Sequence, residues 1–429
     1  MLKAYEQARG ADLAVVGLGY VGLPLAREGS GSGLRVVGLD RDQVLVSRLA
    51  SGSSHIDDVS DPDVRQMLKA GFLPTTDESA LAGAQAMVIC VPTPLLPDGM
   101  PDLSAVISAA GTVSRNITPG ALVVLESTTY PGTTEEVVRP ILEAGSGLTA
   151  GIGFHLAYSP ERVDPRNPDF GLRNTPKVVG GCTPACTSAA AALYSKLCDE
   201  VITARSTREA ELAKLIENTY RQVNIALVNE MAIFCHDLGV DIWDAISCAA
   251  TKPFGFEAFR PGPGVGGHCI PIDPSYLSYK VRTLGFPFRF AELAQEINGR
   301  MPAYIVERAA SMLNRKQRTL NGSRILLLGV TYKPNIADLR ETPALPIARK
   351  LCRAGARMAY HDPHVSAWDI DGEPVERVTD RELVIELDAA DLVILIQNHA
   401  MYDHDLLAAP GRLILDTRGR ISHPCAERL

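Results

Sequence analysis

The chain has 429 residues, of which 46% are hydrophobic, and its formal net charge is −8. This length predicts two or three domains, and this hydrophobic content excludes a disordered chain. The acidic balance, with basic residues scattered along the sequence, argues against a nucleic-acid-binding protein, and no run reaches the roughly 18 apolar residues that a membrane span needs.

The nine cysteines have no paired spacing, and the N-terminus lacks the apolar segment of a secretory signal. We therefore expect free thiols in a reducing, cytoplasmic environment. Cys182 and Cys186 are isolated from other ligand-type residues, so no metal site is expected.

The N-terminal part alternates short apolar runs with amphipathic segments, and the runs lie at residues 13–17, 35–40, 86–91, 121–125 and 154–158. This alternation predicts βαβ units and hence a parallel, doubly wound sheet. We assign residues 1–205 to this first domain. The glycine-rich stretch 29–33 predicts a loose turn before the second strand.

The segment 209–238 contains neither glycine nor proline, and its apolar residues recur with helical spacing at Leu212, Ile216, Val223 and Leu227. One long amphipathic helix is predicted, with Gly239 as its stop. Further helices are predicted at 242–250 and 290–313. We assign residues 206–313 to a central helical domain, which is a candidate interface for a homodimer.

A polar linker at 314–323 precedes a second α/β part, with strands predicted at 324–329, 357–360, 391–396 and 413–416. We assign residues 314–429 to a third domain. The predicted fold class is α/β, with two Rossmann-like doubly wound domains joined by a long central helix.

The first strand is followed by a glycine-rich loop in which Gly17, Gly19 and Gly22 have the spacing G-x-G-x-x-G, with Tyr20 and Val21 between the last two. These glycines permit a tight turn, a close approach to a pyrophosphate and close packing of the following helix. The pattern predicts dinucleotide binding, although a glycine-rich turn of another α/β protein would look the same.

Asp40 ends the second strand, at about the distance along the chain where a carboxylate binds a ribose 2′-hydroxyl. A carboxylate there would repel a 2′-phosphate, so NAD is predicted rather than NADP, although Arg41 leaves NADP open. Because ligands of such folds bind at the carboxyl ends of strands, the loops that follow later strands are expected at the nicotinamide, with ordinary turn chemistry as the alternative. Their candidate residues are Pro92, Thr93, Ser127 and Thr128.

Cys269 follows a flexible glycine run, and Asp273 lies four residues further on. Downstream of a dinucleotide fingerprint, this suggests covalent thiol chemistry coupled to hydride transfer. Four more polar residues recur with helical spacing and are expected on one helix face. By themselves they are more typical of a solvated charged face; they are Glu211, Lys214, Asn218 and Arg221.

In combination, five motifs resemble those of the UDP-glucose/GDP-mannose dehydrogenase family, and they lie at residues 17–24, 158–163, 211–218, 266–273 and 333–341. The resemblance covers nearly the whole chain, from Gly17 to about Arg420. It implies a cytoplasmic, homodimeric enzyme that uses two NAD molecules to oxidise the C6 alcohol of a UDP-sugar to a carboxylate, for the assembly of polysaccharides or glycosides.

The resemblance implies that Cys269 is the nucleophile. Its thiolate would capture the C6 aldehyde as a thiohemiacetal, and oxidation of this adduct would give a thioester that water cleaves. Lys214 is implied to stabilise the developing oxyanion and to exchange protons with the C6 hydroxyl. The alternative for Cys269 is a buried small side chain, as most free cysteines are.

Four further catalytic roles follow from the resemblance. Asn218 would hold the same oxygen or an ordered water, and Asp273 would orient that water or act as a base. Glu161 would assist thioester hydrolysis, and Thr128 would bind the water or the sugar. Two structural alternatives stay open: Asp273 also fits a helix N-cap before a proline, and Glu161 also fits a simple ion pair with its neighbour Arg162.

The third domain is expected to hold the nucleotide of the substrate, with Lys333 and Arg340 beyond its first strand. Arg260 is placed to bind a phosphate, and Phe256 and Phe259 to pack on a base or ribose. A solvated side chain is the alternative for each charged residue. The remaining expected contacts are Arg162, Val163 and Gly266 with the substrate, and Arg340 and Arg418 with the cofactor.

His268 and Ile272 stand where enzymes of this family that act on UDP-glucose carry serine and lysine. With the motif at 126–134, this resembles the branch that oxidises UDP-N-acetylhexosamines, UDP-N-acetylglucosamine in particular. Arg166, where that branch has glycine, keeps UDP-glucose or another nucleotide's glucose open as the substrate. Two other functions also stay open, a dehydrogenase that stops at the aldehyde and a non-catalytic nucleotide-sugar sensor.

Overall fold

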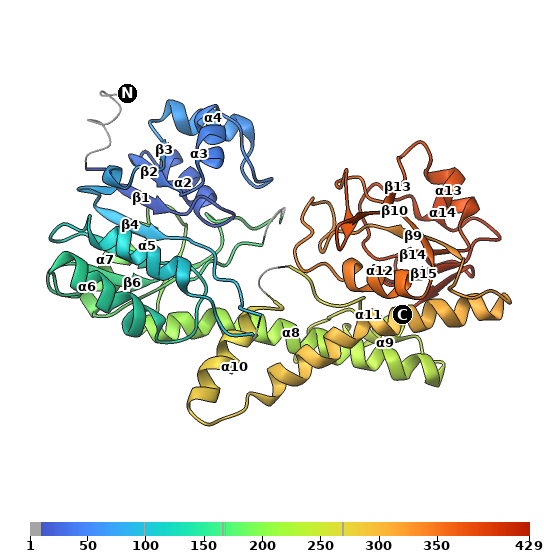
Figure 1. The fold of residues 1–429 in the computed structure, drawn as a ribbon. Coiled ribbons are helices and arrows are strands. Elements are labelled where there is room, and N and C mark those ends of the chain that lie inside the picture. Colours follow the sequence, from blue (N-terminus) through green and yellow to red (C-terminus); the bar gives the residue numbers. More distant parts are fainter. Residues whose placement is uncertain (1–9, 98, 165–166, 168, 268–269) are drawn as a thin grey trace. The chain divides into compact units, whose positions relative to one another are not determined.

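The structure is a computed structural model, and it describes residues 10–97, 99–164, 167, 169–267 and 270–429 (Figure 1). The chain divides into two compact units. Unit 1 holds the residues up to Glu217 together with Ser275–Phe286, and unit 2 holds Asn218–Pro274 and Pro287–Leu429. Two helices, α8 (Thr207–Leu238) and α10 (Asp273–Thr283), each contribute residues to both units.

Unit 1 is built on one eight-stranded sheet with the order β3-β2-β1-β4-β5-β6-β7-β8. Its strands are β1 (Leu13–Val16), β2 (Val36–Leu39), β3 (Leu73–Thr75), β4 (Ala86–Ile89), β5 (Leu122–Leu125), β6 (His155–Tyr158), β7 (Lys177–Gly181) and β8 (Val201–Thr203). Its helices before α8 are α2 (Gly22–Gly31), α3 (Gln43–Ala50), α4 (Asp61–Lys69), the 3₁₀ helix η1 (Glu78–Leu81), α5 (Ser104–Ser114), the π-helix η2 (Thr134–Val138), α6 (Arg139–Ser146) and α7 (Pro184–Tyr194).

The central strands, such as β1, β4 and β5, are apolar throughout because both of their faces are covered, whereas the edge strand β8 is largely exposed. In β1, Leu13 and Val15 pack into one hydrophobic cluster, whereas Ala14 and Val16 pack into another on the opposite face. Successive side chains of a strand point to opposite faces, so helices on both sides demand a continuous apolar run. The same division holds in unit 2, where Ile325 and Leu326 belong to different clusters.

Unit 2 contains a six-stranded sheet with the order β13-β10-β9-β14-β15-β16 and a small antiparallel pair, β11-β12. Its strands are β9 (Arg324–Leu328), β10 (Arg357–His361), β11 (Asp369–Ile370), β12 (Glu373–Pro374), β13 (Glu376–Arg377), β14 (Leu392–Leu395), β15 (Ile414–Asp416) and β16 (Ala426–Arg428). Its helices are α9 (Ile242–Ala249), α11 (Arg289–Arg315), α12 (Ala344–Arg353), α13 (Leu383–Ala389) and α14 (His404–Leu407).

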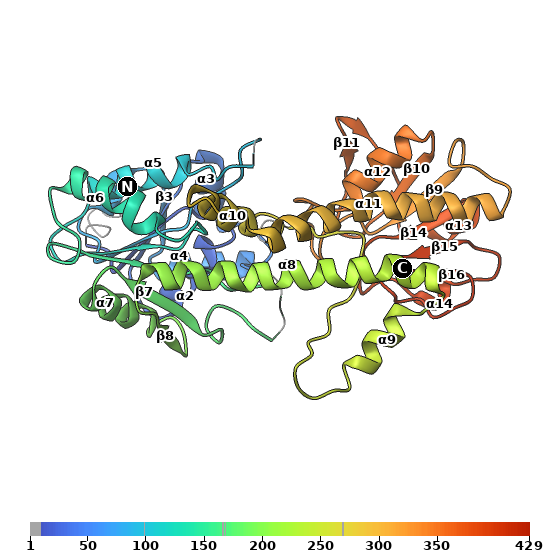
Figure 2. The ribbon, with the colours of Figure 1, turned by 90° about the horizontal axis from the view of Figure 1, so that it is seen from below.

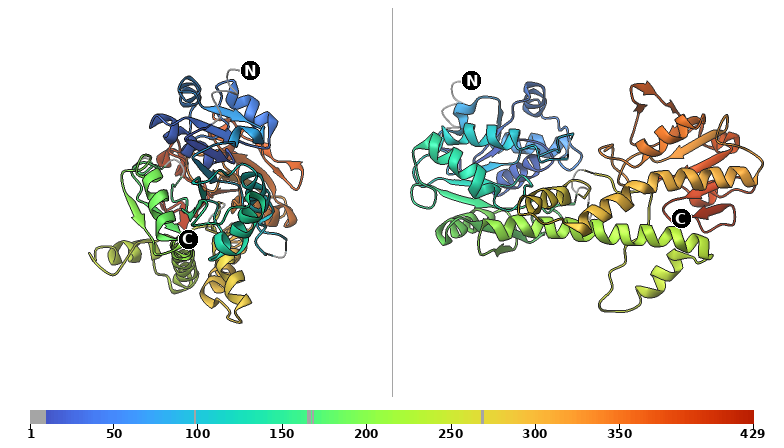
Figure 3. Two further views of the ribbon diagram at one scale, coloured as in Figure 1. Left: turned by 90° about the vertical axis from the view of Figure 1, so that its left-hand side faces the viewer. Right: turned by 60° about the horizontal axis from the view of Figure 1, so that its bottom comes forward.

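Two α/β units and one 32-residue helix confirm the predicted fold class. Figure 2 shows α8 as one uninterrupted helix, and Figure 3 shows the similarly long α11. In each sheet the strand order runs outward in two directions from the first strand, β1 or β9. The reversal lies between β1 and β4 and between β9 and β14, and ligands of such sheets bind at the carboxyl ends of the strands beside it.

The first sheet is not parallel throughout, in contrast to the prediction. Strand β7 runs antiparallel to β6, with Tyr158 opposite Gly180, and β8 runs parallel to β7. The described residues between β6 and β7 form no helix, and an antiparallel neighbour needs no helical crossover over one face of the sheet. The first residues of β7 therefore lie at the edge where β6 ends.

The loose turn predicted at 29–33 is also wrong in part, because α2 continues to Gly31. A Cβ on Gly29 would lie 2.9 Å from a methyl carbon of Leu13, so this glycine allows the helix to pack closely on β1. The turn is confined to the following residues and uses Gly33, whose φ is +80°.

The apolar residues that predicted α8 are not all buried. Ile216 is 56% exposed and Leu227 is 52% exposed, whereas smaller residues such as Ala226 and Ala232 are buried in the chain. The prediction of a long helix is correct, but only some of its large apolar side chains pack inside the chain, among them the fully buried Leu215. Among the described residues, no helix combines the length and the apolar character needed to cross a membrane.

We predict that Gly22→Ala destabilises unit 1 by about 2–3 kcal/mol, because the added Cβ would lie 1.8 Å from the carbonyl oxygen of Gly17. Gly31→Ala is the matched control on the same helix, since its Cβ would meet no atom within 4 Å. Urea unfolding followed by circular dichroism measures both variants. Equal stabilities of the two variants would contradict the close packing of this loop.

Candidate functional site

The glycine-rich loop after β1 has the geometry of an anion-binding turn. Gly17 has a φ of +95°, and a Cβ on this residue would lie 2.7 Å from the carbonyl oxygen of Cys90. A Cβ on Gly19 would meet no atom within 4 Å, so the backbone there is open to a ligand. No side chain caps the N-terminus of α2, whose N–H groups can therefore bind a phosphate. Tyr20 is exposed beside this loop and Val21 is half-buried.

Asp40 is fixed at the end of β2 by two backbone groups. Its Oδ2 accepts a hydrogen bond from Leu18 N at 2.8 Å, and its Oδ1 accepts one from Asp42 N at 3.0 Å. A carboxylate has about four acceptor sites, so both oxygens can still accept from the hydroxyls of a ribose. Arg41 is exposed. The loop and this carboxylate together fit the predicted dinucleotide.

The loops after β4 and β5 are tied to each other by hydroxyl groups. Thr93 Oγ1 donates to the carbonyl oxygen of Thr128 at 2.8 Å, and Ser127 Oγ donates to that of Val91 at 2.7 Å. The hydroxyl of Tyr276 in α10 donates to the carbonyl oxygen of Thr93. The structure therefore brings the predicted residues of both loops together, with Pro92 exposed beside them.

Sequence analysis missed a neighbouring threonine. Thr129 is fully buried, and its Oγ1 has no hydrogen-bond partner within the described residues. A buried hydroxyl without a partner is uncommon in a folded protein and is typical of a position that a ligand or water satisfies. In the sequence Thr129 directly follows Ser127 and Thr128, and no local pattern distinguishes the two threonines. The structure does, since Thr128 is only half-buried.

Glu211 does not belong to a solvated charged face. It is fully buried, and its carboxylate accepts hydrogen bonds from Gly132 N at 2.6 Å, from Thr134 N at 2.9 Å and from Thr134 Oγ1 at 2.7 Å. Burial raises the pKa of this carboxyl to about 7, while the bonds from Thr134 and Gly132 act in the opposite direction. Glu211 thus anchors the start of α8 to the turn that follows the β5 loop.

Lys214 lies one turn further along α8, still in unit 1, and is only 7% exposed. Asn218 and Asp273, both in unit 2, are also buried, and Asn218 Nδ2 donates to Asp273 Oδ2. Arg221, by contrast, is exposed. Arg221 therefore does not share the buried face of the other three polar residues. Because Glu211, Lys214 and Asn218 are buried, that face is not a solvated charged surface.

Glu161 follows β6, and it does not pair with its neighbour Arg162. Its Oε1 accepts from Val163 N at 2.5 Å, and its Oε2 lies 3.6 Å from Nζ of Lys177. Arg162 instead pairs with Glu217 at 2.8 Å and donates to the carbonyl oxygen of Pro176. The simple ion pair considered for Glu161 and Arg162 is therefore absent from this structure.

In unit 2 the glycine run packs against the loop that follows β9. A Cβ on Gly266 would lie 2.6 Å from that of Tyr332, and the N–H of Gly267 donates to the carbonyl oxygen of Arg340 at 3.0 Å. This places Gly266 beside the segment that carries Lys333 and Arg340. Cys269 and His268 lie outside the described residues, as does Arg166.

The remaining predicted binding residues divide into two groups. The guanidinium group of Arg260 donates to the carbonyl oxygen of Trp243 and to Ser247 of α9, and Phe259 packs edge-on against Tyr220. Lys333 is half-buried, whereas Phe256 and Arg340 are exposed. The contacts of Arg260 and Phe259 hold the segment before the glycine run against α8 and α9, so these two residues have a structural role at least.

Arg418 follows β15 and donates through Nε to the carbonyl oxygen of Ile396 at 2.7 Å. Burial lowers the pKa of this guanidinium group to about 10, against the attraction of Asp416. The side chain also lies against the glycine run, since a Cβ on Gly262 would be 3.1 Å from its Nη1. A partly buried guanidinium group beside a glycine-rich backbone is suited to an anionic group of a ligand.

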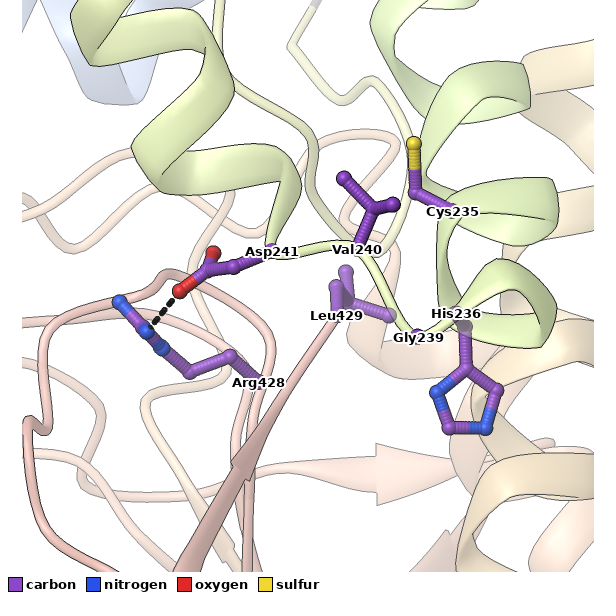
Figure 4. Close-up of a pocket in the computed structure, with 7 residues that line it drawn as sticks. All are labelled: Cys235, His236, Gly239, Val240, Asp241, Arg428 and Leu429. Atoms are coloured by element: carbon purple, nitrogen blue, oxygen red, sulfur yellow. Dashed lines mark hydrogen bonds and ion pairs between the residues drawn. The ribbon is translucent and has the colours of Figure 1, made fainter.

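A cavity of about 240 Å³ lies elsewhere in unit 2, at the carboxyl end of α8 (Figure 4). None of the predicted site residues lines it. Its polar lining consists mainly of His236 and the ion pair between Arg428 and Asp241. Within the part of the chain that the structure describes, no group of three or more His, Cys, Asp or Glu side chains could hold a metal ion.

Three family models of the UDP-glucose/GDP-mannose dehydrogenases match the chain. The NAD-binding domain matches residues 11–198, the central domain residues 208–300 and the UDP-binding domain residues 326–423. The UDP-N-acetyl-D-glucosamine 6-dehydrogenase of Pseudomonas aeruginosa is 38% identical over 363 residues, which cover 83% of this chain and 84% of that protein.

Solved structures are similar over nearly the whole chain. The UDP-D-ManNAc dehydrogenase of Pyrococcus horikoshii has a TM-score of 0.87 and 32% identity, covering 97% of this chain and 98% of its own. A UDP-glucose dehydrogenase from Pyrobaculum islandicum has a TM-score of 0.86 and 29% identity, covering 98% of this chain and 97% of its own. The predicted resemblance to this family is confirmed.

We predict that Glu211 makes folding more favourable at low pH. Its pKa in the fold, about 7, lies above its ordinary value of 4.5, so the stabilisation is complete below about pH 4.5 and is lost as the pH rises through 7. The loss amounts to about 3 kcal/mol. Unfolding free energies measured from pH 4.5 to 8 should show this slope in the native protein and not in Glu211→Gln, and parallel curves would contradict it.

Proposed function

Since the chain belongs to the UDP-glucose/GDP-mannose dehydrogenase family, we propose that it oxidises C6 of a UDP-N-acetylhexosamine, most simply UDP-N-acetylglucosamine, to a carboxylate. The protein is an NAD-dependent nucleotide-sugar dehydrogenase. The observation that carries the proposed mechanism is the burial of Lys214, Asn218 and Asp273. Polar groups are buried at a cost, so buried residues of these types are typical of a reaction site.

NAD supplies the hydride acceptor for each of the two oxidations, and the loop at 17–22 with Asp40 would hold it. In this proposal Cys269 provides the nucleophile for the aldehyde. Its sulfur bonds to C6 as a thiohemiacetal, and the second oxidation converts this adduct to a thioester. Thiolate is both a better nucleophile and a better leaving group than a serine alkoxide, which is the chemical reason for a cysteine at this position.

The buried polar residues have separate proposed roles. The ammonium group of Lys214 would stabilise negative charge on the C6 oxygen. This electrostatic attraction is stronger because the side chain is only 7% exposed, so water screens it little. Asn218 is oriented by Asp273 through its amide hydrogen bond, which leaves the amide oxygen to position a water or the sugar. Glu161 would accept a proton from the water that cleaves the thioester, and Thr128 or its buried neighbour Thr129 would hold that water.

Unit 2 is the proposed site of the nucleotide, which agrees with the match of its sheet to a UDP-binding domain. Lys333 and Arg340 lie in the loop after β9, at the reversal of the strand order, where ligands of such sheets bind. We keep the division into domains at 1–205, 206–313 and 314–429 as part of the proposal, with α8 opening the second of them.

The relatives leave the sugar open. The Pseudomonas aeruginosa relative acts on a UDP-N-acetylhexosamine by its name, as does the Pyrococcus horikoshii protein, whereas the Pyrobaculum islandicum protein is a UDP-glucose dehydrogenase. UDP-glucose is therefore the second candidate substrate. A non-catalytic sensor has less support, since binding alone gives no reason to bury the side chain of Lys214.

We also propose a homodimer through α8. Its exposed large apolar side chains recur at intervals of four and seven residues, which places them along one helix face. A continuous apolar stripe on the surface is typical of a protein interface. The stripe consists of Ile216, Tyr220, Leu227, Phe234 and Leu238.

We predict that the purified protein forms two NADH per sugar from UDP-N-acetylglucosamine, with a kcat/KM at least about tenfold above that for UDP-glucose, the size of effect that one well-placed substrate contact gives. Cys269→Ser should lose about 1,000-fold or more in acid formation, because serine is poorly activated for attack on the aldehyde. Absorbance at 340 nm and mass spectrometry of the product measure both.

One NADH per sugar would instead indicate a reaction that stops at the aldehyde. A preference for UDP-glucose would discard the N-acetylhexosamine assignment and keep the mechanism. Native rates in the serine variant would exclude the thioester.

We predict that Leu227→Asp weakens self-association by about 100-fold or more, since it would bury an unpaired carboxylate in the interface. The matched control is Ile152→Asp, because Ile152 is 88% exposed in a loop of unit 1 and lies outside the stripe. Sedimentation equilibrium of both variants and the native protein measures the dissociation constants. A native protein that sediments as a monomer, or equal effects of the two variants, would contradict the interface.

A further inference from the structure

A buried lysine lies at the same sheet edge as the candidate residues of unit 1, and nothing in the proposed mechanism yet uses it. Lys177 is the first residue of β7 and is 4% exposed. Because β7 runs antiparallel to β6, its first residue lies where β6 ends. A parallel strand would have placed this residue at the opposite edge of the sheet.

The ammonium group of Lys177 lies between two carboxylates. Its Nζ is 3.1 Å from Oε1 of Glu126, which follows β5, and 3.6 Å from Oε2 of Glu161, which follows β6. Glu126 is fully buried and also accepts a hydrogen bond from the hydroxyl of Tyr194. With the thiol of Cys90, which donates to its Oε2 at 3.9 Å, Glu126 has three partners, whereas the Oε2 of Glu161 has no hydrogen-bond partner within the described residues.

A small cavity lies at this contact. It measures about 10 Å³ and is lined by Glu161 and Lys177 together with residues of the adjoining loop. This volume is about that of one water molecule, and the two charged groups supply polar contacts for it. The distance of 3.6 Å is too long for a direct hydrogen bond, so the ammonium group acts on Glu161 through its charge.

One ammonium group therefore compensates two buried carboxylates. Burial lowers the pKa of Lys177, but the charges of Glu126 and Glu161 outweigh it and leave the pKa above its ordinary value. Burial raises the pKa of Glu126, and Lys177 counteracts this. The other titratable groups around the cluster are Cys90, Tyr194, Cys198 and the pair of Arg162 with Glu217.

We propose that Lys177 is a positioning residue that holds Glu161 ionised and oriented, and that Glu126 competes with Glu161 for its charge. This rests on the proposed function, in which Glu161 takes a proton during thioester cleavage. In that step the water oxygen bonds to C6, the bond from C6 to sulfur breaks, Cys269 leaves as a thiolate, and one water proton passes to Glu161. Only an ionised Glu161 can accept that proton.

The test compares Glu126→Gln with the double variant Glu126→Gln, Lys177→Met. Both lack the competing carboxylate, so they differ only in the buried ammonium group. Lys177→Met alone is expected to misfold, because it would leave Glu126 buried without a counter-charge. Circular dichroism establishes that the two compared proteins are folded.

Carboxyl ¹³C NMR of glutamate-labelled protein, with the signal of Glu161 assigned by its loss in Glu161→Gln, gives the pH midpoint of Glu161. We expect this midpoint to lie about one pH unit or more higher in the double variant than in Glu126→Gln. The acid limb of kcat for acid formation should shift with it. Relative to the native protein, the acid limb of kcat should move to lower pH in Glu126→Gln and to higher pH in the double variant. The KM for the UDP-sugar should stay unchanged in both.

Equal midpoints of Glu161 in the two variants would overturn the proposal, and this measurement needs no turnover. Different midpoints with an unmoved acid limb would also overturn it, since Lys177 would then not act on the reaction. Failure of the proposed function is seen separately, as a native protein that does not form two NADH per sugar. A purely structural role for Lys177 would change the melting temperature of the double variant and leave both pH readings in place.

Discussion

The need to compensate every buried charge organises the ligand-binding edge of the first sheet. Glu126 and Lys177 pair at 3.1 Å, and Glu211 receives three hydrogen bonds from the turn at 132–134. A single unpaired charge at such a depth would cost several kcal/mol, which is a large part of the stability of a domain. The loops that surround the proposed reaction are thus held in place by the partners of these charges.

The two sheets use the same device to close the turn after their first strand. In unit 1, Asp40 accepts a hydrogen bond from the N–H of Leu18, and in unit 2, Asp362 accepts one from the N–H of Val330 at 2.7 Å. The surroundings then differ. Asp362 is only 1% exposed and is also bonded to His399 at 3.0 Å, whereas Asp40 is half-buried. The acid of the first sheet is available to a ribose and that of the second is committed to the protein, so the same fold serves two different ligands.

The departure of β7 from the parallel arrangement has a consequence for chemistry. It introduces the starts of two strands, β7 and the parallel β8, at the edge where strands β1 to β6 end. Lys177 reaches Glu126 and Glu161 for this reason, and both carboxylates would otherwise face each other's charge without compensation. In the proposed mechanism a proton moves to Glu161 at this edge, and that step would benefit from a fixed positive charge that solvent does not screen.

The sequence alone determined the α/β class, the long helix α8, the dinucleotide loop at 17–22 and the family, because these depend on local periodicity, on glycine spacing and on motifs that lie close together in the chain. Only the tertiary structure decided which polar residues are buried. The helical spacing of Glu211, Lys214, Asn218 and Arg221 is the same for all four, yet Glu211 anchors a turn, Arg221 faces solvent, and Asn218 meets Asp273 from 55 positions away. The pairing of Lys177 with Glu126 and Glu161 was likewise invisible in the sequence. It depends on the direction of one strand, and strand direction is set by long-range packing that no local pattern records.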